Sequence, residues 1–238
     1  MGRLDTVSSD NETFLPRSAT PLGWPELAVG LVLMAVVAFR VPPLLAPHEA
    51  ALGPVLHGLL LAGLPGAAAI AGFTAAARIR VRPWSTFGLI RPSRRWILVA
   101  VGAGLLTVPL SLLAAVAASS VLGSATGAPA GPATGGPPAV GVSVLLVAVV
   151  VPIAQELLFR GIVTTVLLRY GAVIGVVGSA LIFALPQGLT PAFATALVIG
   201  LVTAELRRRS GSLWPAVVAH IVHTLVAQAL VLTVAGAM

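Results

Sequence analysis

Two ionisable side chains stand four residues apart in the middle of a long apolar run. If the run is helical, Glu156 and Arg160 lie on one face, where a carboxylate and a guanidinium can pair. An ionisable side chain at the centre of a membrane span costs roughly 2.5 to 3.5 kcal/mol on insertion scales, so each one needs a reason. The pair could be a neutralised structural contact, or the carboxylate could take part in acid–base chemistry. These residues alone leave both roles open.

A second polar group lies near the C-terminal end of the sequence. His220, His223 and Thr224 are three and four residues apart, so one helix face offers two imidazoles and a hydroxyl. Gln155 and Gln187 add neutral amides in two other apolar runs. Imidazoles serve proton transfer or metal binding, although a single histidine inside a membrane is more often a hydrogen-bonded packing residue.

These side chains belong to a very apolar chain. Of its 238 residues 58% are hydrophobic and 9% charged, and the mean hydropathy is +1.04. A soluble domain of this size could not bury so much apolar surface, so we expect lipid to cover the rest. Cysteine is absent, which excludes disulfides and thiolate chemistry.

The elements that must position the polar groups are membrane-spanning helices. A span needs about 20 apolar residues, and the sequence supplies seven such stretches, at 25–41, 55–77, 96–121, 141–169, 171–187, 190–206 and 212–236. The predicted fold is therefore all-α, a polytopic transmembrane bundle of about seven spans. Between the first two spans we predict an irregular loop at Pro42, Pro43, Pro47 and Pro54. Residues 123–140, rich in Gly, Pro and Ala, predict a flexible external connector.

The chain has a net charge of +7, and all 14 of its basic residues are arginine. The positions of these arginines are more informative than their number. Most of them fall in the loops at 78–95, 169–171 and 207–211, which marks those loops as cytoplasmic in a cell-membrane protein. We expect residues 1–23 to form a disordered cytoplasmic tail and residues 24–238 the membrane domain. Nucleic acid is not an expected partner. Arginine as sole basic residue, with abundant Ala, Gly and Pro, indicates a GC-rich bacterial genome.

Depth in the membrane suggests that the polar groups meet. At about 1.5 Å per helical residue, Gln155, Gln187 and His220 lie roughly 17 to 24 Å from the nearest arginine-bearing loop. All three therefore fall within one slab, which is typical of a catalytic or transport cavity. A small transporter is one alternative, supported by prolines inside the spans, although no inverted repeat is evident.

Three segments carry a resemblance to a known family: PIAQELLFRG at 152–161, LIFALPQG at 181–188 and RRRSGSLWPAVVAHIVHT at 207–224. In this order and spacing they resemble the CAAX prenyl protease and bacteriocin-processing family of intramembrane endopeptidases, also called the CPBP or Abi family. The likeness covers 141–236, and STFGLIRPSRRW at 85–96 is a looser match. The resemblance implies a CAAX-protease-like bundle that processes membrane-bound or prenylated peptides.

Family members carry a Glu-Glu-x-x-x-Arg motif, a Phe-x-x-x-His motif and a His-x-x-x-Asn motif. The resemblance implies that the first Glu and the second-motif His activate water, while the last His and the Asn stabilise the oxyanion. In this chain Gln155, Gln187 and Thr224 stand at the expected Glu, His and Asn positions. The motif positions that are retained are Glu156, Arg160, Phe183 and His220.

The substitutions leave two functions open. An amide cannot take a proton from water, so Gln155 cannot be the general base, a role worth about 10² to 10⁴ in rate. One interpretation is a catalytically impaired pseudoprotease that holds a transmembrane or lipidated peptide in the inherited cavity. The other is an enzyme that uses Glu156 and His220, in one version with a metal on His220 and His223. Against it, adjacent helix positions point about 100° apart, so Glu156 does not occupy the place of residue 155. We expect no cofactor and no metal, and membrane lipid as a further partner.

Overall fold

The computed structural model describes residues 21–122 and 135–236, which are helical and contain no strand. The α-helices are α1 (Trp24–Leu45), α2 (Glu49–Arg78), α3 (Arg94–Leu122), α4 (Gly136–Leu145), α5 (Val151–Leu158), α6 (Thr164–Leu167), α7 (Ser179–Ala184), α8 (Pro191–Ser210) and α9 (Trp214–Gly236). Wider π-helical turns at Leu146–Val150, Phe159–Val163 and Ile174–Gly178 and tight 3₁₀ turns at Ala46–His48, Trp84–Phe87, Leu168–Tyr170 and Leu185–Gln187 complete the described part. The predicted disordered tail, apart from its last residues, lies outside the described residues.

The predicted all-α membrane bundle is confirmed. Within the described part, four helical stretches are long and apolar enough to cross a membrane, and one further apolar stretch is shorter. The four are Trp24–Arg78, which folds back on itself as the hairpin of α1 and α2, Arg94–Leu122, Gly136–Tyr170 and Trp214–Thr233, and the shorter one is Ile174–Gln187. The protein is therefore a multi-pass membrane protein, and the number of spans stays a prediction.

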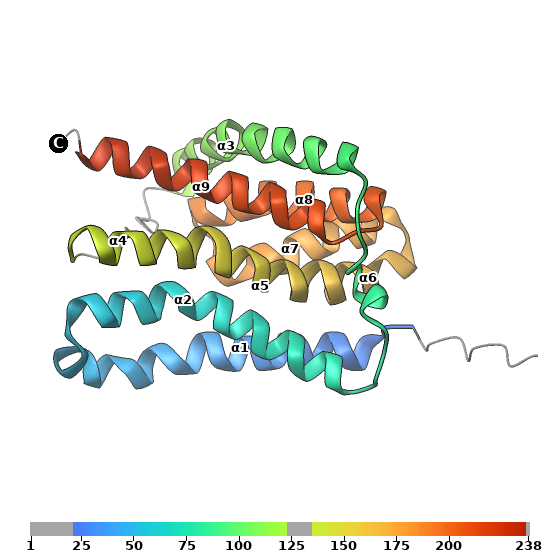
Figure 1. The fold of residues 1–238 in the computed structure, drawn as a ribbon, viewed down its shortest axis with the longest axis horizontal. Helices are drawn as coiled ribbons and strands as arrows, with labels where there is room; N and C mark the ends of the chain where they lie inside the picture. The colour runs from blue at the N-terminus through green and yellow to red at the C-terminus, as the bar shows by residue number, and fades with distance from the viewer. Residues whose placement is uncertain (1–20, 123–134, 237–238) are drawn as a thin grey trace, which may run out of the picture.

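The arginine-rich connectors gather at one end of the bundle. The helices run back and forth along one long axis, so the connector after α2, the turn before α7 and the turn before α9 lie together at the right of Figure 1. The beginning of α1 lies at that same end, and the end of α9 lies at the opposite one. We call the end of the bundle that holds these three connectors the arginine end.

Two predicted connectors are shorter than the sequence suggested. Helix α1 continues through Pro42 and Pro43. The chain reverses at Gly53, whose φ of +74° is a conformation that glycine adopts readily and other residues rarely do. Proline is tolerated in membrane helices where other groups satisfy the freed carbonyls. The connector predicted at 123–140 is also wrong at its C-terminal end, because α4 begins at Gly136 with prolines in its first turn, where their missing N–H is not needed. Residues 123–134 lie outside the described part.

Small residues allow α1 and α2 to pack against each other and against α5. A Cβ on Gly72 would collide with the backbone oxygen of Gly30, so the two helices approach as closely as backbones can. A Cβ on Gly30 would lie 3.0 Å from Leu158 Cδ1, and one on Gly66 would lie 3.1 Å from Val151 Cγ2. In lipid, helix association rests on such close packing. The hairpin thereby supports α5, which carries Glu156.

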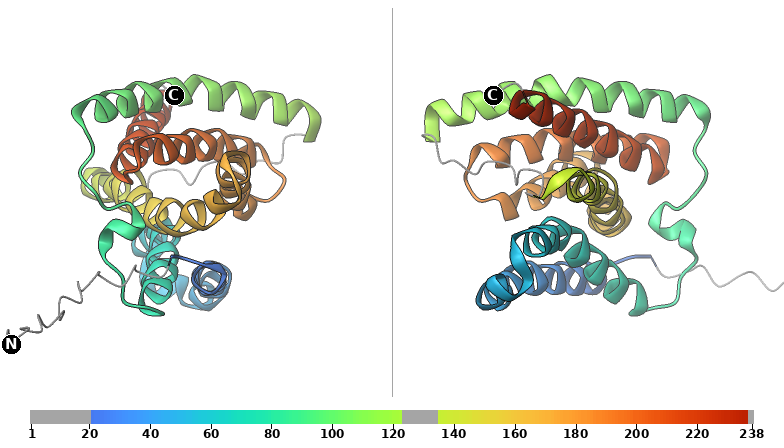
Figure 2. Two further views of the ribbon diagram at one scale, coloured as in Figure 1. Left: turned by 90° about the vertical axis from the view of Figure 1, so that its right-hand side faces the viewer. Right: turned by 60° about the vertical axis from the view of Figure 1, so that its left-hand side comes forward.

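Helix α3 covers the other side of the bundle. It crosses over α8 and α9, as both views of Figure 2 show. A Cβ on Gly104 of α3 would lie 2.6 Å from the carbonyl oxygen of Ala219 in α9. The helices that carry the motif residues are therefore enclosed between the α1–α2 hairpin and α3.

A buried ion pair fastens the arginine end. Glu26, fully buried in the first turn of α1, accepts a hydrogen bond of 2.9 Å from Arg82 Nη2, and the backbone N–H of Gly23 donates to its other oxygen at 2.9 Å. Arg169 donates to the carbonyl oxygen of Leu22 at 2.9 Å. The start of α1 is thus tied both to the connector after α2 and to the end of the helix that holds Glu156.

We expect Gly72→Ala to destabilise the protein, because the added methyl group collides with the Gly30 backbone and overpacking costs about 1 to 3 kcal/mol. The measurement is the thermal midpoint in detergent. Gly102→Ala on α3 is the matched control, since a Cβ there meets nothing within 4 Å. Equal midpoints for the two variants would contradict this packing.

Candidate functional site

The centre of the candidate site is a buried ion pair within one helix. Arg160 Nε lies 3.1 Å from Glu156 Oε2, and both side chains are 0% exposed. Arg160 belongs to the π-helical turn Phe159–Val163 that follows α5. Such turns are frequent at functional sites. The two residues are four apart in the chain, and they form the ion pair that this spacing predicted.

The arginine connects this helix to two others. Arg160 Nη2 donates to the carbonyl oxygen of Gly200 at 2.9 Å and to Thr203 Oγ1 at 2.5 Å, both on α8. Its Cζ lies 4.7 Å from the centre of the Phe183 ring on α7, in a cation–π contact. One guanidinium thus holds three helices in register.

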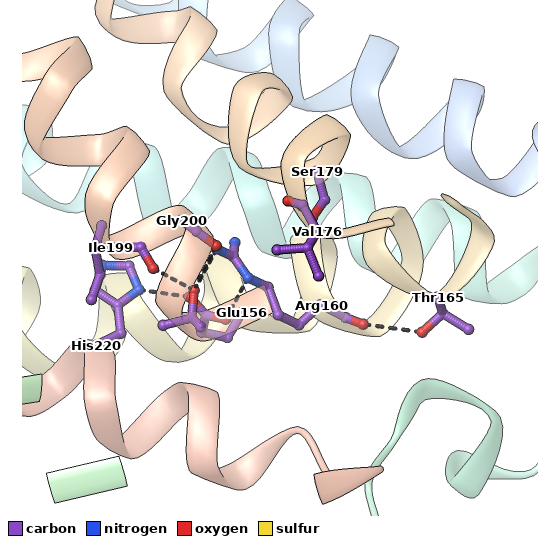
Figure 3. Close-up of polar contacts among 9 residues, drawn as sticks. Glu156, Arg160, Thr165, Val176, Ser179, Ile199, Gly200 and His220 are labelled. Atoms are coloured by element: carbon purple, nitrogen blue, oxygen red, sulfur yellow. Dashed lines mark hydrogen bonds and ion pairs between the residues drawn. The ribbon is translucent and has the colours of Figure 1, made fainter. Parts of the chain in front are cut away.

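His220 brings α9 to the same carboxylate. Its Nδ1 lies 2.8 Å from Glu156 Oε1, and its ring packs edge-on against Phe183 with 5.7 Å between ring centres. Figure 3 shows the imidazole and the guanidinium approaching Glu156. We call Glu156, Arg160, Phe183 and His220 the Glu156 cluster. It consists of the four motif positions at which this chain retains the family's residues.

The three substituted motif positions lie outside this network of contacts. Gln155 is half-buried, and its amide makes no hydrogen bond with the described residues. Gln187, in the tight turn after α7, is exposed, and its side chain makes no hydrogen bond with Gln155 or His220. Thr224 Oγ1 donates to the carbonyl oxygen of His220 at 2.9 Å, so its hydroxyl satisfies its own helix.

His223 has a different partner from His220. Its Nδ1 lies 3.0 Å from Thr107 Oγ1 on α3, while that hydroxyl donates to the carbonyl oxygen of Gly104 at 2.6 Å. The two imidazoles of α9 therefore face different helices. Among the described residues, no group of three or more His, Cys, Asp or Glu side chains could hold a metal ion.

Both oxygens of Glu156 face positive or donating groups, which limits what the carboxylate can do. Oε1 meets His220 and Oε2 meets Arg160, and none of the side chain is exposed. A general base must reach a water or substrate proton at about 2.6 to 3.2 Å. In this arrangement the carboxylate neutralises the guanidinium and links α5 to α9.

The polar network is not fully satisfied. Arg160 Nη1 and Thr164 Oγ1 are buried and lack a hydrogen-bond partner among the described residues. A buried polar group without a partner costs about 1 to 3 kcal/mol.

Sequence analysis missed Thr203 and Thr107, which contact Arg160 and His223. Each is a hydroxyl residue in an apolar helix, where threonine is common, so its residue type alone does not mark it. A usable signal was available for Thr203, since a buried guanidinium with five donors needs more acceptors than one carboxylate offers.

The structure is a multi-pass helical bundle with a buried Glu–Arg–His cluster among its apolar helices. Residues 137–226 match the family model described as Type II CAAX prenyl endopeptidase Rce1-like. The resemblance to the CAAX protease family is thereby confirmed over the part of the chain that holds the Glu156 cluster. No curated protein and no solved structure matches the chain.

The buried pair should show strong coupling in a double-mutant cycle. Arg160→Met and Glu156→Gln should each lower the free energy of unfolding by about 3 to 5 kcal/mol, because each leaves a buried group without its partner. The double variant should lose clearly less than the sum, measured by unfolding in mixed detergent micelles. Glu205→Gln, which removes partly exposed pairs with Arg208 and Arg209, should have little effect. Additive losses for the Glu156–Arg160 pair would contradict the coupling.

Proposed function

We propose that this protein is a member of the CAAX-type endopeptidase fold that binds a membrane-embedded or lipidated peptide and does not hydrolyse it. One observation carries this proposal. The carboxylate of Glu156, at a retained motif position, is fully buried between Arg160 and His220. The neighbouring position, which would supply the base, holds the amide of Gln155. The scaffold keeps the contacts that join its helices and lacks the group that removes a proton from water.

Binding is supported by the state of Gln155. Its amide is half-buried and makes no hydrogen bond with the described residues. It therefore keeps a donor and an acceptor that a peptide backbone could satisfy without charge. Exchanging a carboxylate for an amide suits recognition of a neutral backbone better than attack on it.

We further propose that the protein lies in the cell membrane with the arginine end in the cytoplasm. The three arginine-bearing connectors lie together at that end, which agrees with the bias of cytoplasmic loops toward positive charge. The N-terminus would then be cytoplasmic and the C-terminus external.

A residual peptidase is the second candidate function, and the His220–Glu156 contact favours it. A carboxylate 2.8 Å from an imidazole is the arrangement of an acid–base dyad. For this function Glu156 must leave Arg160 and reach a water molecule, which requires a rearrangement of the Glu156 cluster.

Restoring the motif should distinguish the two functions. In liposomes with a prenylated CAAX peptide, the wild type should cleave no faster than Glu156→Ala. The triple variant Gln155→Glu, Gln187→His, Thr224→Asn should cleave about 10²-fold above that background, because the general base returns. Wild-type cleavage that Glu156→Ala abolishes would contradict the proposal and establish the dyad.

Peptide binding should be detectable without turnover. A photoreactive prenylated peptide should label the reconstituted wild type, and Gln155→Leu should reduce labelling about fivefold, since roughly 1 kcal/mol is lost with one hydrogen bond. Gln228→Leu, in the C-terminal half of α9, is the control for removing an amide. Equal labelling of all three proteins would show that Gln155 does not contact the peptide.

A further inference from the structure

A second candidate site lies on the outside of the bundle, away from the Glu156 cluster. An open groove of about 400 Å³ runs between α3, α8 and the turn that precedes α7. This volume is within the range of small-molecule sites, about 300 to 1,000 Å³. Its wall is formed by Trp96, Val99, Val176, Leu201, Val202 and Leu206.

The groove ends in charged side chains at the arginine end. Glu205 and Arg209 line it, and Arg94 and Arg95 immediately precede Trp96 in the exposed first turn of α3. Tryptophan is enriched where the apolar layer of a membrane meets its headgroups. The groove is therefore apolar along its length, and its charged end lies beside the basic start of α3.

Positive charge at this end exceeds what the protein neutralises. Glu205 pairs with Arg208 through two hydrogen bonds of 2.7 Å and with Arg209 through Nε. Arg209 is still 62% exposed, which leaves its outer nitrogens available. None of the ion pairs within the described residues involves Arg94 or Arg95.

We propose that this groove binds one acidic phospholipid, with an acyl chain against Trp96, Val99 and Val202 and the phosphate at the arginines. Arg209 lines the groove and Arg94, Arg95 and Arg208 belong to the same helix ends, so these four arginines against Glu205 leave a formal charge of +3 around the end of the groove. This charge attracts an anionic headgroup more strongly than a zwitterionic one. An apolar wall in a lipid-exposed position selects a chain, and guanidinium groups select phosphate oxygens.

A lipid bound in this groove would also stabilise the helical bundle. The groove lies between α3 and α8. Helix α8 also carries Thr203, whose hydroxyl accepts a hydrogen bond from Arg160. A lipid bound between α3 and α8 would stabilise the helix against which the Glu156 cluster rests. This inference does not depend on whether the protein hydrolyses peptides.

The test compares lipids with identical acyl chains. Phosphatidylglycerol added to the detergent-purified protein should raise its thermal midpoint more than phosphatidylcholine does, and native mass spectrometry should show one retained phosphatidylglycerol. Arg94→Gln/Arg95→Gln should weaken the apparent affinity about thirtyfold, since each basic residue near an anionic surface is worth roughly fivefold. Arg40→Gln, exposed toward the opposite end of α1, should leave the affinity unchanged.

The apolar part of the site has its own pair of variants. Val99→Trp should fill the groove and reduce phosphatidylglycerol retention, whereas Val101→Trp, exposed on the same helix outside the groove, should not. Equal protection by the two lipids, equal losses for the Arg94/Arg95 and Arg40 variants, or protection by glycerol phosphate alone would overturn the proposal. So would a concentration-dependent dimer that covers the groove and excludes the lipid.

Discussion

The structure depends on one buried contact, the carboxylate of Glu156 between the guanidinium of Arg160 and the imidazole of His220. In lipid the apolar surfaces of helices give little reason to choose one neighbour over another, so polar contacts and close packing decide the arrangement. Arg160 selects α7 and α8 through Phe183, Gly200 and Thr203, and Glu156 selects α9 through His220. The rest of the bundle encloses these four helical segments.

Under the proposed function, the same contact explains why a chain without peptidase activity can keep the fold. In the family's motif two acidic residues are adjacent, and adjacent helix positions point about 100° apart. The residue at 156 faces the arginine and joins helices, while position 155 faces elsewhere and makes no hydrogen bond with the described residues. Under the proposed function, an amide at 155 lacks a base and breaks no contact that holds the bundle together. Sequence change can accumulate at the reacting position while the structural one is retained.

Much of this arrangement could be predicted from periodicity and spacing. The Glu156–Arg160 pair followed from its four-residue separation, and the apolar runs located the ends of the helices to within about six residues. Depth along a helix was less informative, because it gives a level in the membrane and no direction. Gln187 is exposed in the structure, which depth does not indicate, and α1 continues through Pro42 and Pro43, where the prolines predict a loop. Contacts between helices, such as Arg160 with Thr203, depend on packing order, which one sequence does not contain.

The most direct test of the account is transfer of oxygen from water to a peptide. Liposomes containing the wild-type protein would be incubated in ¹⁸O-labelled water with a library of membrane-anchored peptides, and all products examined by mass spectrometry. With an amide at 155 and both oxygens of Glu156 engaged, we expect no new carboxyl group carrying ¹⁸O beyond that in protein-free liposomes. Labelled products that appear with the wild type and vanish with Glu156→Ala would show that the buried carboxylate does activate water.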